Sequence, residues 1–268
     1  MGDCAVNVID ENRETHIAYK LLVEGDHFGE IGVVYDCCRT ATIVSRNYNT
    51  INNLSIEGFR DLVNELPQYA ELLKRHIYQY NDPLKLFSKS IITKIPYFGP
   101  SFMNKHLFHK ILFSFAPRFI EMGNLLLKEG DKVESIFIVQ SGTLEIYASF
   151  EGNEFIIEKL HRGSVLNYRV IFNGDEMHAG VRATQNTHLL ELSAAKLTEI
   201  RESDKIYGQK VTMWENQLLR SGRTTPLDYM VGTIGKPSGI ERSKKNKNIL
   251  KNIIYERCLE VRLQKSKP

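Results

Sequence analysis

The sequence predicts an α+β protein that is mainly β, made of two copies of a small, jelly-roll-like β-roll with flanking helices. Short apolar runs alternate with polar residues, which is typical of half-buried strands. Glycines recur about every ten to twelve residues in the second half, a spacing typical of turns in small sandwiches and barrels. The apolar pattern of the first quarter also returns further along the chain. A chain of 268 residues has room for two such domains.

Strands are predicted most clearly in the second half of the chain. Leu144, Ile146 and Ala148 alternate with more polar neighbours. The apolar runs 137–139 and 155–157 predict two further strands, and the glycines that mark the turns are Gly130, Gly142, Gly152 and Gly163.

The repeat runs at an offset of 138 residues without a gap, over residues 4–62 and 142–200. Few positions are identical, but apolar sites fall on apolar sites throughout. The matching pairs are Val6 and Leu144, Val8 and Ile146, Ile17 and Phe155, Leu22 and Leu160, Gly25 and Gly163, Ala41 and Ala179, Ile43 and Val181, Leu54 and Leu192, Ser55 and Ser193, and Leu62 and Ile200. The repeat predicts two copies of one domain type.

We predict four parts. Residues 1–80 form a partial first domain, 81–105 a linker with helices, 106–220 the second domain, and 221–268 a basic, partly helical tail. Apolar residues at helical spacing predict helices over 56–80, interrupted at Pro67, and over 197–218. The first copy begins at the point that matches residue 139, so it lacks the first strands of its domain. We therefore expect the chain to be a fragment of a longer protein or a shortened gene model, because a roll without those strands has open edges.

Composition excludes several classes of protein. The hydrophobic share of 42% and the charged share of 25% indicate a globular protein, and the net charge of +3 is too small to indicate a nucleic-acid partner. No apolar run could span a bilayer and no signal sequence is present, which predicts a cytoplasmic location. The four cysteines have neither zinc-site nor disulfide-framework spacing, so we expect four reduced thiols at Cys4, Cys37, Cys38 and Cys258.

The C-terminal tail is strongly basic. Residues 236–267 contain ten Lys or Arg against three acidic residues. A solvated helix is the simplest interpretation, and contact with acidic lipid headgroups is the second. Nucleic acid comes last, because no aromatic residues or recognition motif accompany the charge.

The run of residues 25–43 contains the residues that could bind a ligand. Gly29 lets backbone approach a ligand closely, and the amides of Glu30 and Ile31 lie at the start of a helical turn, where an anion is favoured. Arg39 has a guanidinium whose planar fork matches two phosphate oxygens. A carboxylate at Glu30 would repel phosphate but can accept a hydrogen bond from a sugar hydroxyl. The simpler alternative is that Glu30 and Arg39 pair with each other across a turn.

These residues resemble the phosphate-binding cassette of the cyclic nucleotide-binding domain family. The family pattern begins with Phe-Gly-Glu, followed by an aliphatic residue and a small residue. After a short loop it continues with Arg, then a small residue, then Ala, then either Ser or Thr, and finally a β-branched residue. Here the pattern is matched without a gap by Phe28, Gly29, Glu30, Ile31, Arg39, Thr40 and Ala41. One departure is Cys38, where proline is common. We use the name cassette for residues 28–41.

The resemblance implies a β-roll that binds cAMP or cGMP as its ligand, with no other cofactor and no metal. It assigns Arg39 and the amides near Gly29 and Ile31 to the cyclic phosphate, and Glu30 to the ribose 2′-hydroxyl. Thr40 favours tolerance of cGMP, although the sequence leaves the choice between the two nucleotides open. In the family, the last helix closes over the base of the nucleotide as a lid. Here the segment 72–80, with Ile77, would form that lid.

The second copy lacks the ligand-contacting side chains. At the offset of 138, Asn167, Tyr168, Met177 and His178 stand where the first copy has Gly29, Glu30, Arg39 and Thr40. Arg169 and Arg182 lie nearby but at other points of the pattern. We therefore expect one nucleotide per chain.

Nothing in the sequence suggests a catalytic group, so we predict that the chain is not an enzyme. The segment 157–167 resembles protist (ciliate-type) cation-channel-like proteins with tandem nucleotide-binding domains. This resemblance implies regulation of a cation (potassium) channel, an upstream transmembrane region, a homo-tetramer and a place at the cytoplasmic face of a membrane. The alternatives are a kinase regulatory-subunit-like protein and a scaffold that binds no ligand.

Overall fold

The computed structural model describes residues 2–10, 15–79, 83–150, 153–168, 171, 176–177, 179–221 and 231–232. The chain divides into two compact units, which we call unit 1 (Met1–Ala116) and unit 2 (Pro117–Pro268). None of the helices in the described ranges combines the length and the apolar character that crossing a bilayer requires. Apart from the strand β12 (Val231–Gly232), the predicted basic tail lies outside the described residues.

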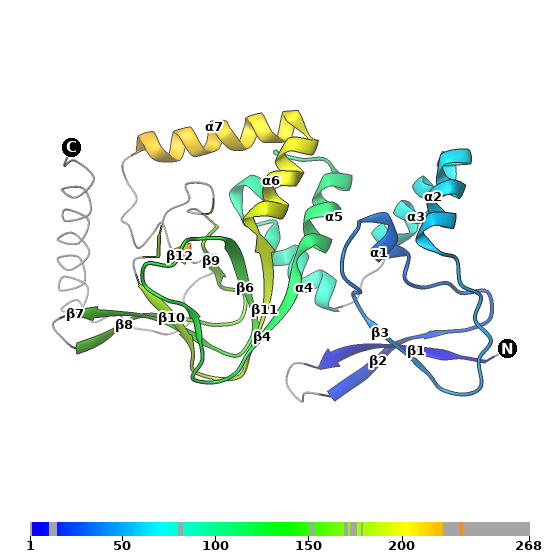
Figure 1. The fold of residues 1–268 in the computed structure, drawn as a ribbon, viewed down its shortest axis with the longest axis horizontal. Helices are drawn as coiled ribbons and strands as arrows, with labels where there is room; N and C mark the ends of the chain where they lie inside the picture. Colours follow the sequence, from blue (N-terminus) through cyan, green and yellow to red (C-terminus); the bar gives the residue numbers. More distant parts are fainter. Residues whose placement is uncertain are drawn as a thin grey trace. The chain divides into compact units, whose positions relative to one another are not determined.

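Unit 1 has a three-stranded antiparallel sheet in the order β2-β1-β3 (Figure 1). The central strand β1 (Cys4–Asp10) pairs on one side with β2 (Thr15–Leu22) and on the other with β3 (Thr42–Ser45). The short helix α1 (Glu30–Val34) lies in the connection between β2 and β3. Residues 28–41 therefore leave the sheet from one outer strand and return to it at the other.

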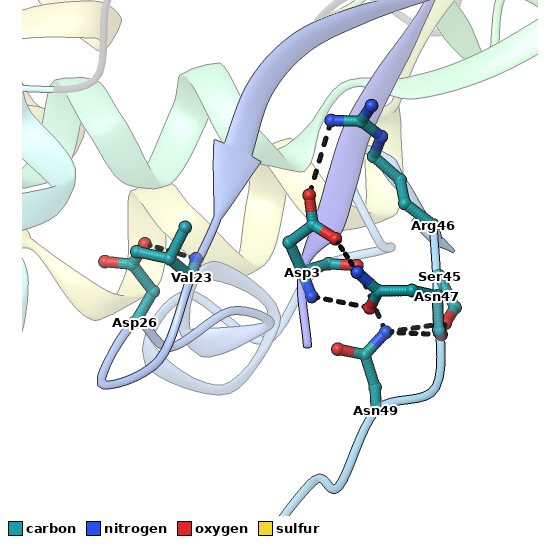
Figure 2. Close-up of polar contacts among 7 residues, drawn as sticks. All are labelled: Asp3, Val23, Asp26, Ser45, Arg46, Asn47 and Asn49. Carbon is teal, nitrogen blue, oxygen red and sulfur yellow. Dashed lines mark hydrogen bonds and ion pairs between the residues drawn. The ribbon is translucent and has the colours of Figure 1, made fainter. Parts of the chain in front are cut away.

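A polar network holds the end of β3 against the start of β1 (Figure 2). The Asp3 backbone amide donates to the side-chain oxygen of Asn47 (2.9 Å), and the Asn47 amide donates back to the Asp3 carboxylate. Arg46 forms an ion pair with the same carboxylate (3.3 Å), and Asn49 donates to the Asp3 carbonyl oxygen (3.1 Å). The network fixes where the chain leaves the sheet after the cassette.

Helices complete unit 1. The predicted helix over 56–80 is confirmed as two helices that meet at Pro67, as expected for a residue that cannot continue a helix. Ser55 caps the first of them by accepting from the Gly58 amide. The helices of the unit are α2 (Ile56–Glu65), α3 (Pro67–Gln79), α4 (Pro83–Ile92), the 3-10 turn η1 (Pro96–Phe98) and α5 (Lys105–Ser114).

The core of unit 1 lies among these helices. Fully buried residues from several helices meet there, and the largest of them are Ile77, Ile92, Ile95, Tyr97, Phe98 and Ile111. By contrast, several apolar residues of the unit 1 sheet are exposed, including Leu21 (47%) and Val44 (43%). Most of the apolar burial in unit 1 therefore comes from helix packing and not from its sheet.

Unit 2 is an antiparallel β-roll with two sheets, in the orders β5-β10-β7-β8 and β12-β9-β6-β11-β4. The predicted strand with Leu144, Ile146 and Ala148 is confirmed as β7, in which these three residues are buried. The strands are β4 (Ala116–Ile120), β5 (Leu125–Leu127), β6 (Ser135–Ser141), β7 (Leu144–Phe150), β8 (Asn153–Leu160), β9 (Val165–Leu166), β10 (Gly180–Ala183) and β11 (Thr187–Ser193).

Two helices end the roll of unit 2. Helix α6 (Ala194–Ser203) follows β11 directly, and α7 (Lys205–Ser221) turns sharply away from it (Figure 1). Gly208 permits this turn, because a Cβ there would lie 2.9 Å from the Arg201 carbonyl oxygen. The predicted helical stretch over 197–218 is thus confirmed as two helices.

The elements of the two units recur in the same order. The strands β2 and β3 and the helix α2 lie 138 residues before β8, β10 and α6. The predicted gap-free offset is wrong for β1, however. Cys4 pairs with Leu22 and Leu144 pairs with Leu160, so β1 matches β7 at an offset of 140. The reason is the β1–β2 connection (residues 11–14), which is two residues longer than its counterpart (151–152). A shift of two keeps each side chain on its face of the sheet.

Candidate functional site

A tight turn leads into the cassette. The Val23 amide donates to the Asp26 carboxylate (3.0 Å; Figure 2), and the Asp26 amide donates back to the Val23 carbonyl oxygen (3.0 Å). Gly25 within the turn has a φ of +90°, a conformation that costs glycine little. Unit 2 has the same turn at the offset of 138, where the His161 amide donates to the Ser164 hydroxyl and Gly163 has a φ of +85°.

The structure brings Gly29 and Arg39 together. The Nη1 of Arg39 donates to the Gly29 carbonyl oxygen across 2.7 Å. Gly29 has a φ of +87°, and a Cβ built on it would lie 3.1 Å from that Nη1. A Cβ on Gly32 would lie 3.0 Å from the same atom. The two glycines therefore make room for the guanidinium beside the first turn of α1. Our sequence analysis did not single out Gly32, although the Gly29-x-x-Gly32 spacing of one helical turn is a signal that could have found it.

Among the described residues, no acidic side chain neutralises the positive charge at this point. Arg39 is exposed and Glu30 is half-buried, and within the described ranges these two side chains form no ion pair. The simpler alternative, a Glu30–Arg39 pair across the turn, is therefore wrong. No side chain caps the amides at the start of α1. A guanidinium with spare donors beside uncapped backbone amides is chemically suited to a compact anion.

The remaining cassette residues lie around this point. Phe28 is 43% exposed, and Ile31 and Ala41 are half-buried. Thr40 is exposed on the strand side of Arg39, one residue from Ala41. Among the described residues, no group of three or more His, Cys, Asp or Glu side chains could hold a metal ion.

Helix α3 packs beside the cassette. The His27 and His76 rings lie 5.3 Å apart between centroids, which joins the residue before Phe28 to α3. Tyr35, the residue after α1, is buried against the ring of Phe113 (5.1 Å), and this burial raises the pKa of its hydroxyl. Ile77, which we had expected to contribute to the lid, is fully buried in the helical core. The exposed apolar residues of α3 are Tyr69 and Leu72, and Tyr80 lies outside the described residues.

Unit 2 shares one backbone feature of the cassette but not its chemistry. Asn167, at the position of Gly29, also has a positive φ of +68°. Its side chain is fully buried and donates to the Ser135 carbonyl oxygen (3.2 Å). Tyr168 and Met177, at the positions of Glu30 and Arg39, are 3% and 1% exposed. The residues at these two positions are therefore buried and carry no charge that could bind a phosphate.

Arg182, the described arginine near this region of unit 2, is engaged elsewhere. Its Nε donates to the Glu145 carboxylate (2.6 Å), and its Nη1 donates to Glu154 (2.9 Å). Its guanidinium also stacks over the Tyr147 ring, 4.5 Å from the centroid. These contacts hold β7, β8 and β10 together, so Arg182 does not substitute for Arg39. Arg169 and His178 lie outside the described residues.

Comparison with protein families identifies unit 2. The family model described as "Cyclic nucleotide-binding domain" matches residues 117–204. Unit 2 is therefore similar to a cyclic nucleotide-binding domain over residues 117–204, and it has the expected mainly β roll with flanking helices. The match covers the unit whose cassette positions are filled, and the residues of the Phe28–Ala41 cassette lie before it.

Relatives of known function are regulators or kinases. The chain is 22% identical over 161 residues to human (Homo sapiens) cGMP-dependent protein kinase 2, covering 59% of this chain and 19% of that protein. It is 23% identical over 175 residues to the cAMP-dependent protein kinase regulatory subunit of Mycosarcoma maydis, covering 65% of this chain and 30% of that protein. The chain thus spans less than a third of either relative.

Similar solved structures include a kinase regulatory domain and a catabolite activator protein. The regulatory domain of Toxoplasma gondii PKA in a co-crystal structure with cAMP is 15% identical, with a TM-score of 0.39, 81% of this chain covered and 76% of that chain. The Thermus thermophilus catabolite activator protein is 19% identical, with a TM-score of 0.38, 47% of this chain covered and 59% of that chain.

Proposed function

We propose that the chain is a cyclic nucleotide-sensing module whose binding site is the unit 1 cassette. One observation supports the proposal above all: the exposed, unneutralised Arg39 guanidinium lies 2.7 Å from the Gly29 carbonyl oxygen, beside the uncapped start of α1. In this proposal Arg39 and the amides near Gly29 and Ile31 bind the cyclic phosphate, and Glu30 accepts from the ribose hydroxyl. Phe28, Thr40 and Ala41 border the site. Unit 1 is then a second domain of the unit 2 type, with one nucleotide-binding site per chain.

The proposed mechanism is a population shift. The nucleotide favours the state in which α3 is closed over the cassette, and the contacts of α1 with α3 transmit the change. The His27–His76 contact and the buried Tyr35 join the cassette to the helices and support this route. No catalytic step is involved.

The output of the module is a kinase or a channel. A kinase regulatory-subunit-like role is favoured by the relatives, because the two quoted above are a cGMP-dependent kinase and the regulatory subunit of a cAMP-dependent kinase. Regulation of a cation channel is the second candidate and rests on the likeness of residues 157–167 to channel-like proteins. That role would add a transmembrane region, a tetramer at the cytoplasmic face of a membrane, and acidic lipid beside the basic tail.

Isothermal titration of the full chain with cAMP and with cGMP tests the binding site. We expect one nucleotide per chain. The Arg39→Ala variant should weaken binding about tenfold to a hundredfold, because a charge-assisted hydrogen bond to phosphate is lost. Arg46→Ala is the matched control, since Arg46 is an exposed arginine of the same unit that pairs with Asp3. Absence of heat with both nucleotides, or equal affinity in Arg39→Ala and the wild type, would contradict the proposal.

A binding assay with a kinase catalytic subunit separates the two outputs. Inhibition of the kinase that is relieved by cAMP or cGMP supports the regulatory-subunit role. Failure to bind or inhibit the kinase, with nucleotide binding intact, removes that role and favours the channel.

A further inference from the structure

Two adjacent cysteines, Cys37 and Cys38, lie in the loop between α1 and Arg39. Cys38 is exposed, Cys37 is half-buried, and both carry thiols rather than a disulfide. The Cys37 amide donates to the Gly32 carbonyl oxygen (3.3 Å), and its sulfur lies 3.8 Å from the Ile31 carbonyl oxygen. The loop is thus attached to α1 through Cys37, and the nucleotide chemistry proposed above uses neither thiol.

The backbone on both sides of the pair is constrained. Asp36, just before it, has a φ of +49°, which is uncommon for a residue other than glycine. Arg39, just after it, reaches back to the Gly29 carbonyl oxygen across 2.7 Å. Only Cys37 and Cys38 lie between the turn at Asp36 and Arg39, whose guanidinium is proposed to bind the phosphate. A change in the backbone conformation of these two residues would therefore move Arg39.

We propose that Cys37 and Cys38 form a reversible disulfide that weakens nucleotide binding at the cassette. The effect on binding rests on the proposed function, whereas the bond itself does not. The oxidant is hydrogen peroxide. The Cys38 sulfur attacks one peroxide oxygen, the O–O bond breaks, and a sulfenic acid and one water form. The Cys37 sulfur then attacks the Cys38 sulfur, the S–O bond breaks, and a second water leaves. The two thiols lose two electrons and two protons, and one peroxide is reduced to two waters.

The geometry of adjacent residues explains why the bond acts as a switch. Cα atoms joined by a trans peptide are about 3.8 Å apart, whereas most disulfides join Cα atoms about 4.4 to 6.8 Å apart. Closing the bond therefore distorts the backbone between Cys37 and Cys38, and such strained disulfides are readily reduced. At the offset of 138, unit 2 has Asp175 and Glu176 in place of the pair, so the switch belongs to unit 1 alone.

The test uses the full chain treated with hydrogen peroxide and then with dithiothreitol. After peroxide, the peptide that contains both cysteines should lose the mass of two hydrogens, and affinity for the bound nucleotide should fall about tenfold, the loss expected when Arg39 leaves the phosphate. Dithiothreitol should restore both. The Cys38→Ser and Cys37→Ser variants should bind nucleotide and keep their affinity in peroxide. Cys4→Ser, which removes a buried thiol of β1, should respond as the wild type does.

The outcomes separate this proposal from the one on which it rests. An unchanged peptide mass, or a gain of oxygen without loss of the two hydrogens, overturns the disulfide. A disulfide that forms while affinity stays the same overturns the switch. A reduced chain that binds neither nucleotide contradicts the proposed function, and the peptide mass then decides on the bond alone.

Discussion

The cassette of unit 1 and its counterpart in unit 2 share a positive φ at one matching position but differ in the residues around it. Gly29 and Asn167 both adopt a positive φ, of +87° and +68°. Arg39 is exposed, whereas Met177 at the matching position is 1% exposed. The difference teaches that the positive φ at this position does not depend on the charged residues of the cassette, because Asn167 adopts it where Tyr168 and Met177 are buried.

We expect the largest effect when the arginine of the unit 1 cassette is placed at the matching position of unit 2. Met177→Arg would bury an unpaired charge in a filled core, which should lower the free energy of unfolding of unit 2 by about 4 kcal/mol. Trp214, the single tryptophan, lies in α7 and reports on this unit by its fluorescence during urea unfolding. Met177→Leu is the matched control. A Met177→Arg protein as stable as the wild type would show that the site is open to solvent.

The second prediction is that the stability of unit 1 depends on pH through one buried histidine of that unit. His109 of unit 1 is 4% exposed, its Nδ1–H donates to the Lys105 carbonyl oxygen (2.8 Å), and burial lowers its pKa to about 4. The unfolded chain binds this proton near pH 6.5, so the stabilisation is full above that pH and is lost as pH falls toward about 4. The full loss for unit 1 is of order 3 kcal/mol, of which about 2 kcal/mol falls between pH 7 and pH 5.

Urea unfolding followed by circular dichroism at pH 7 and pH 5 measures this effect, with Trp214 fluorescence recorded alongside for unit 2. His109→Phe keeps an aromatic ring beside Tyr78, whose ring lies 4.5 Å from that of His109, and should remove most of the pH dependence. An equal pH dependence in His109→Phe and the wild type would assign it to other groups.

The third prediction compares two arginines. Arg182→Met leaves the carboxylate of Glu145, 7% exposed, without its ion-pair partner, and should lower the stability of unit 2 by about 2 kcal/mol. Arg39→Met changes an exposed side chain and should alter stability by less than about 0.5 kcal/mol while weakening nucleotide binding. Thermal unfolding and titration of the two variants give the comparison. A reversal, with Arg39→Met the less stable protein, would make Arg39 a structural residue.

The smallest effect is expected at the glycines. Gly29→Ala forces a positive φ on alanine, at a cost of about 1 kcal/mol, and places its Cβ 3.1 Å from the Arg39 Nη1. Gly123→Ala is the matched control, because Gly123 has a φ of +88° and nothing lies within 4 Å of its Cβ. Both variants should lose similar stability, but only Gly29→Ala should lose affinity for nucleotide in a titration.

The sequence predicted the elements well where local signals were strong. Alternation at Leu144 and Ile146 predicted a strand, and Pro67 predicted the break between two helices, because both depend on residues close in the chain. The offset of β1 was predicted wrongly because a shift of two preserves the apolar pattern. Only the pairing of Cys4 with Leu22 and of Leu144 with Leu160 reveals it.

The sequence predicted which residues of the candidate site come together, but it did not predict how the neighbouring helix packs around them. The motif led to Gly29 and Arg39, and the structure joins them by a hydrogen bond. The assignment of all the cassette residues to a nucleotide stays a prediction. The burial of Ile77 and the contact between His27 and His76 depend on how α3 packs, which no local pattern encodes.

The path of the cassette between two outer strands has a consequence for measuring occupancy. Since β1 lies between β2 and β3, its amides become accessible to solvent only when one of the outer strands separates from it. The cassette connects those same two strands, so a ligand that orders it restrains both edges of the sheet at once. Slower amide hydrogen exchange at residues 4–7 of β1, which pair with both neighbours, would therefore report binding without any label on the nucleotide.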